Sequence, residues 1–114
     1  MRLPLGRDDT VLLREAAAYL SRRMSDPRDV ETLGQVEDRL DALLLGRARE
    51  AGVLELDPRQ ADVLDMALAS YAEILSAPGS DVSNRARIAR LRAVSRRIRS
   101  RATVIGRLFG WLRG

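Results

Sequence analysis

The side chains with the clearest chemical potential are the arginines near the end of the chain. Residues 82–114 contain ten arginines and no acidic residue, which gives a net formal charge of +10. A guanidinium group is planar, keeps its charge, and binds phosphate or carboxylate through two hydrogen bonds. This segment therefore predicts a phosphate-rich partner. We assign the nucleic-acid contacts to Arg85, Arg87, Arg90, Arg92, Arg96, Arg97, Arg99 and Arg101.

The rest of the chain has the opposite charge. Residues 1–81 contain ten arginines and sixteen acidic residues, so their net formal charge is −6. Such an asymmetry predicts either a polyanion as partner or an acidic half that covers a basic half. In the second case, the acids that face the arginines would include Glu37, Asp38, Asp41, Asp62 and Asp65.

Catalytic chemistry has little support in the sequence. The chain has no Cys, no His and no Lys, which excludes thiol nucleophiles, imidazole bases, most zinc sites and Schiff-base chemistry. Asp62 with Asp65, and Glu37 with Asp41, are spaced to share a helix face and could hold Mg²⁺. A solvated acidic face is the simpler interpretation. We therefore predict that the protein is not an enzyme and has no catalytic residue, metal ligand or cofactor.

An apolar stripe accompanies the arginines. Leu91 and Ile98 begin a series that recurs every seven residues, the spacing of a helical seam. Bulky apolar residues become denser toward the chain end and include the only Phe and the only Trp. One interpretation is that the stripe packs on the preceding helices. The other makes it an oligomer or membrane anchor formed by Leu91, Ile98, Ile105, Leu108, Phe109, Trp111 and Leu112.

Four helical segments are available to position these side chains. Apolar residues at helical spacing predict a first helix over residues 9–24. The Asp-Pro pairs at 26–27 and 57–58 supply an N-cap followed by Pro, and they begin the second and third helices. The Pro-Gly pair at 78–79 ends the third helix. A long fourth helix then runs over about residues 80–112.

These elements predict an all-α fold, a small helical bundle of about four helices with a long Arg-rich amphipathic C-terminal helix. Residues 1–79 form an acidic three-helix body, and residues 80–114 form the Arg-rich helix, in the same domain or as a projecting arm. No segment alternates convincingly with a period of two, so no sheet is expected, and residues 53–56 are the only strand-like stretch. Asp-Pro-Arg occurs twice, 31 positions apart. Two independent uses of capping chemistry explain this more simply than a duplicated helical unit.

Two short stretches resemble known families. Residues 59–64, RQADVL, together with Ala67, Leu68 and Tyr71, are similar to the second helix of ribbon-helix-helix repressors, which implies DNA binding. The strand that such repressors need before this stretch is not expected here, because a helix precedes it. Residues 104–114, VIGRLFGWLRG, resemble the amphipathic membrane-targeting tails of bacterial division-site proteins, which implies contact with a membrane surface.

Three kinds of partner remain open. We favour nucleic acid, bound through the DNA backbone with little sequence readout. The second possibility is a protein partner or a homo-oligomer joined at the helical seam, and self-association is expected. The third is an anionic membrane surface. Because no apolar run could cross a membrane and no signal pattern opens the chain, we expect a cytoplasmic protein, with membrane or nucleoid association left open.

Overall fold

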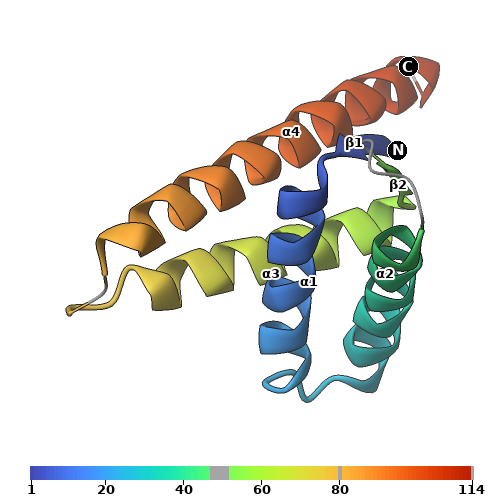
Figure 1. The fold of residues 1–114 in the computed structure, drawn as a ribbon. Coiled ribbons are helices and arrows are strands. Elements are labelled where there is room, and N and C mark those ends of the chain that lie inside the picture. Colours follow the sequence, from blue (N-terminus) through green and yellow to red (C-terminus); the bar gives the residue numbers. More distant parts are fainter. Residues whose placement is uncertain (47–51, 80, 114) are drawn as a thin grey trace.

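The structure is a computed structural model that describes the backbone of residues 1–46, 52–79 and 81–113, and their side chains as far as Arg101. Within these residues, two short strands and four helices follow one another along the chain (Figure 1). This helical bundle, with its long last helix, confirms the predicted fold class. The elements are β1 Arg2–Leu5, α1 Arg7–Ser21, α2 Pro27–Leu45, β2 Gly52–Glu55, α3 Pro58–Leu75 and α4 Val82–Arg113.

Capping side chains determine where α2 and α3 begin. Asp26 accepts a hydrogen bond from the backbone N–H of Arg28 at 2.9 Å, and Pro27 occupies the first helical position. Asp57 accepts from the backbone N–H of Gln60 at 2.7 Å, while the Gln60 side chain accepts from the N–H of Asp57 at 3.0 Å. This reciprocal pair is a capping box. Both helices therefore begin where the Asp-Pro pairs predict, because these partners satisfy N–H groups that a first turn leaves free.

The prediction that the chain has no sheet is wrong. β1 and β2 pair antiparallel, with Leu3 opposite Leu54 and Arg2 opposite Glu55. Each strand has only four residues, which is too short for a clear period-two pattern in the sequence. Leu3 and Leu54 are buried. Strand formation thus depends on the pairing and on burial against the helices, which neither strand's own composition reveals.

The helices share one apolar core with the inner side of this ribbon. Leu13 of α1, Leu33 of α2, Leu64 of α3 and Leu91 of α4 are each 0% exposed. α4 lies along α3 (Figure 1), and its buried residues as far as Ile98 belong to the same core. The described part of the apolar stripe therefore packs on the preceding helices.

The order strand–helix–helix occurs twice, as β1–α1–α2 and as β2–α3–α4. Equivalent residues are 51 positions apart in the strands and first helices, and 58 positions apart in the second helices. Leu3 and its equivalent Leu54 lie opposite each other in the ribbon, as equivalent residues do on a two-fold axis. The buried residues match in pairs: Leu3 and Leu54, Leu5 and Leu56, Leu13 and Leu64, Ala16 and Ala67, Leu33 and Leu91, Val36 and Val94, Leu40 and Ile98.

A contact between helix and strand repeats in the same way. Arg39 of α2 donates a hydrogen bond to the backbone carbonyl of Glu55 in β2. Its equivalent in α4, Arg97, donates to the backbone carbonyl of Pro4 in β1 at 2.6 Å. The two halves are therefore related by an approximate internal two-fold axis. The two Asp-Pro-Arg triplets begin α2 and α3, which are not equivalent helices, so the triplets are not copies of each other.

Candidate nucleic-acid interface

The eight predicted arginines lie on two sides of α4, because successive residues of an α-helix are about 100° apart. We call the side that borders α3 the α3-side row; it consists of Arg85, Arg92, Arg96 and Arg99. The side that borders α1 and β1 is the α1-side row; it consists of Arg87, Arg90, Arg97 and Arg101. Between Arg85 and Arg101, the exposed strip between the two rows carries small side chains, Ala86, Ala89, Ala93 and Ser100.

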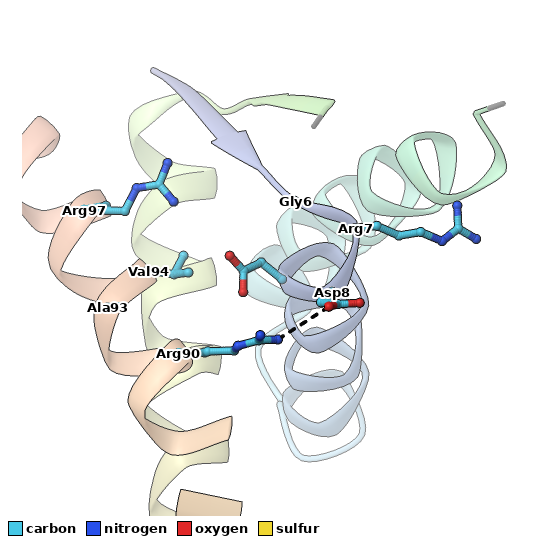
Figure 2. A pocket seen from close by; sticks show the side chains of 8 residues that line it. Gly6, Arg7, Asp8, Arg90, Ala93, Val94 and Arg97 are labelled. Carbon is cyan, nitrogen blue, oxygen red and sulfur yellow. Dashed lines mark ion pairs between the residues drawn. The ribbon is translucent and has the colours of Figure 1, made fainter. Parts of the chain in front are cut away.

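Acidic and carbonyl oxygens of the first half hold most of the α1-side row. Arg90 approaches Asp8 at 3.9 Å across the groove between α4 and the start of α1 (Figure 2). Arg97, farther along the same wall, donates to the carbonyl of Pro4. Arg87 forms an ion pair with Glu15 of α1. These three guanidinium groups therefore already have oxygen partners within the chain.

Arg87 belongs to a cluster that links α1, α3 and α4. It donates a hydrogen bond to the hydroxyl of Tyr71 at 3.0 Å. The ring centroids of Tyr71 and Tyr19 lie 5.4 Å apart. The guanidinium carbon of Arg23 lies 3.8 Å from the centroid of the Tyr19 ring. Burial alone would lower the pKa of Arg87, but Tyr71 and Glu15 outweigh it and leave that pKa raised. Arg87 thus remains charged, and its role here is to join helices.

The α3-side row has far fewer partners. Arg99 pairs with Asp65 of α3 at 2.9 Å. Arg85, Arg92 and Arg96 form no hydrogen bond or ion pair within the described part of the chain. All three are exposed, and they span about 16 Å of helix at 1.5 Å per residue. Together they form a strip of positive charge that the described body does not neutralise.

A groove runs beside this strip. Arg92, Arg96 and Arg99 line one wall of it, and α3 supplies the opposite wall, which includes Ala69 and Glu73. Its floor includes buried apolar side chains from both helices, and no aromatic residue lines it among the residues that the structure describes. The exposed side chains of Arg92 and Arg96 border this groove.

Sequence reasoning placed all eight arginines in one site, and the structure divides them. Of the acids expected to face the arginines of α4, Asp65 does so. Glu37 and Asp41 instead bind Arg14 of α1, at 2.9 and 2.7 Å. The acids that hold Arg87 and Arg90 come from α1, and no local sequence signal connects residues so far apart.

The residues predicted as an oligomer or membrane anchor fall into two groups. Leu91 and Ile98 are 0% and 2% exposed in the core of their own chain, so neither offers a surface to a partner in this conformation. The remaining members lie outside the residues whose side chains the structure describes; they are Ile105, Leu108, Phe109, Trp111 and Leu112.

The strand required by the ribbon-helix-helix resemblance is present, contrary to expectation: β2 directly precedes α3. In proteins that read DNA with strands, the paired strands enter a groove. Here the exposed side chains of the ribbon are Arg2, Pro4, Val53 and Glu55. Arg2 and Glu55 form an ion pair at 3.4 Å, so this surface has no net charge. The α3-side row of α4 is therefore the better candidate for contact with a polyanion.

A function for this chain has to be argued from this geometry, because comparisons with known proteins give no match. No protein-family model, no curated protein and no solved structure matches the chain. Among the described residues, no helix is both long enough and apolar enough to cross a bilayer. The acidic side chains in the same part of the chain form no group of three or more that could hold a metal ion.

Proposed function

We propose that this protein is a non-enzymatic nucleic-acid-binding protein that uses the α3-side row of α4 to contact the phosphates of a DNA backbone. The observation that carries the proposal is that Arg85, Arg92 and Arg96 are exposed, lie on one side of a packed helix, and have no partner among the described residues. Each guanidinium group can bind a phosphate through two hydrogen bonds. Binding would release condensed counterions, which supplies affinity without sequence preference.

Little sequence readout follows from the side chains around the row. Specific recognition of base edges relies on polar groups that enter a groove, often as bidentate pairs. The strip beside the row consists of Ala86, Ala89, Ala93 and Ser100, which offers small surfaces and a single hydroxyl group. These side chains let a backbone approach closely but distinguish few bases.

The described part of α4 favours phosphate over a membrane or a second protein. An interfacial membrane helix needs bulky apolar side chains on its buried face. Among the described side chains of α4, Val82 is the one exposed large apolar residue, and Leu91 and Ile98 are already covered by the body. Binding to a membrane surface or to a protein partner is therefore an alternative that the test below distinguishes from DNA binding.

The test is fluorescence anisotropy with a short labelled DNA duplex over a series of salt concentrations. The variant carries Arg85→Gln, Arg92→Gln and Arg96→Gln. The control carries Arg7→Gln, Arg22→Gln and Arg28→Gln, which removes the same charge from exposed positions outside α4. If each of the three arginines neutralises one phosphate, the log–log salt slope of the variant should be shallower by about 2.7. The control should keep most of the native slope.

Three results would contradict the proposal. The first is absence of binding at about 50 mM salt, a condition that favours phosphate contacts. The second is an equal loss of slope in variant and control, which would assign binding to net charge alone. The third is displacement of the protein by anionic liposomes but not by unlabelled duplex, which would favour the membrane surface.

A further inference from the structure

Several equivalent positions of the two halves carry opposite charges, although Arg39 and Arg97 are both basic. Arg96 and Arg99 of α4 correspond to Asp38 and Asp41 of α2. Arg92 corresponds to Gly34, whose helix position is open: a Cβ added there meets no atom within 4 Å. Two of the four positions of α2 that are equivalent to the α3-side row are therefore acidic, and the other two, Pro27 and Gly34, are uncharged.

The reversal extends to the contacts inside each half. In the first half, Arg14 of α1 binds Asp41 of α2 at 2.7 Å. The equivalent residues of the second half are Asp65 of α3 and Arg99 of α4, which pair at 2.9 Å with the charges exchanged. The contact occurs at the same place in both halves, but the basic residue lies on the first helix in one half and on the second helix in the other.

The contacts that cross between the halves are reversed as well. Arg59 of α3 approaches Asp29 of α2 at 3.4 Å and donates to Thr32 at 3.2 Å. The positions related to Arg59 and Thr32 by the internal two-fold axis are Asp8 and Arg90, which approach each other at 3.9 Å. The basic partner thus comes from the second half in both contacts, from its first helix in one and from its second helix in the other.

We infer that the protein binds a polyanion on one side only, with α4 against the backbone and α2 directed away from it. This inference rests on the proposed function and adds the orientation and the number of contact surfaces. Asp38 and Glu31 are exposed on the side of α2 that is equivalent to the α3-side row, whereas the exposed Arg28 and Arg39 lie toward the other side of that helix. A phosphate backbone is therefore repelled on this acidic side of α2, while α4 attracts it. The internal two-fold axis therefore does not produce two equal contact surfaces, and the bound site needs no two-fold symmetry.

The repeat supplies a matched pair of probe positions. Ser100 of α4 and its equivalent Ala42 of α2 are both small and exposed. The native chain has no Cys, so Ser100→Cys and Ala42→Cys each provide one thiol for a photo-crosslinker. The measurement is the yield of crosslinks to a short DNA duplex at each position. We expect a yield about tenfold higher at position 100, the ratio given by about 1.4 kcal/mol of orientational preference.

A second variant moves the charges. Arg92→Gln and Arg96→Asp combined with Gly34→Arg and Asp38→Arg transfer the two central arginines of the row from α4 to α2 and leave the net charge unchanged. In this variant the preference should shift toward position 42 while affinity persists. If it does not fold, the native pair of probes still decides the question.

The failures of the two proposals differ. Equal crosslinking at positions 42 and 100 in a protein that binds DNA overturns one-sided binding and leaves the proposed function in place. A higher yield at position 42 in the native sequence also overturns it. Absence of salt-dependent binding by anisotropy overturns the proposed function itself.

Discussion

The first and second halves of this chain share a backbone order and a core pattern but differ in charge. Leu33, Val36 and Leu40 of α2 are buried at the positions that Leu91, Val94 and Ile98 take in α4. Beside these residues, acidic and basic side chains have exchanged places. Apolar burial is non-directional and scales with area, so it specifies the helix pair whatever the charges beside it.

A guanidinium and a carboxylate attract each other whichever helix carries each of them, and both the original and the reversed pair join their two helices. The interior does not tolerate an exchange of this kind, because in a closely packed core each buried apolar side chain contributes to stability. The buried residues therefore specify the shared fold of the two halves, while the exposed sides of their helices can have separate roles. Substitutions at equivalent positions test this division.

The largest effect is expected in the shared core. Leu33→Ala and Leu91→Ala should each lower the free energy of unfolding by about 2–5 kcal/mol, because each removes a fully buried side chain. Urea denaturation followed by circular dichroism measures both. Val53→Ala, on the exposed side of the ribbon, is the control and should change stability little. A nearly neutral Leu91→Ala would mean that α4 is not held by the core as α2 is.

The caps of the two equivalent helices α1 and α3 should give the next largest effect. Asp57→Ala removes the side-chain partner of the Gln60 N–H and should cost about 1 kcal/mol. The equivalent N-cap of α1 is Gly6, which makes no side-chain cap. Gly6→Ser should therefore stabilise by a few tenths of a kcal/mol, and its added Cβ meets no atom within 4 Å. Thermal unfolding compares the two variants, and equal destabilisation by both would contradict this account.

The reversed ion pairs should give the smallest effect. A double-mutant cycle on Arg14 and Asp41 should show a coupling of about 0.5–1 kcal/mol, whereas one on Asp65 and Arg99 should stay below about 0.5 kcal/mol. The reason is exposure: the side chain of Arg14 is 29% exposed and that of Arg99 is 66% exposed. A larger coupling in the second half would show that solvent screening does not set the difference.

The same pair predicts a direction for pH dependence. The hydrogen bond from Arg14 to Asp41 is the largest cause of the raised pKa of Arg14. A raised pKa means that the stabilising charged form is complete below the ordinary Arg value and is lost only as the pH rises through the raised value. The coupling between Arg14 and Asp41 should therefore be constant from neutral to mildly alkaline pH. A fall within that range would contradict the assignment.

The helices and the separation of charge could be predicted from the amino-acid sequence. Asp-Pro pairs and apolar residues at helical spacing predicted α2 and α3, because caps and one-sided apolar faces are local properties. The stripe containing Leu91 and Ile98 predicted a long amphipathic helix for the same reason. The sequence also named the eight arginines of α4 as candidate nucleic-acid contacts, but it did not distinguish one of them from another.

The ribbon, the repeat and the division of the arginines into two rows became visible in the packed fold. Two strands of four residues are defined by pairing with each other, and the repeat is obscured because its second helices are shifted by 58 positions rather than 51. Arg87 is held by Glu15, 72 positions away, and Arg99 by Asp65, 34 positions away. Such pairs exist only after packing has brought the helices together. Arg85, Arg92 and Arg96 were therefore distinguished from their neighbours by what surrounds them in space.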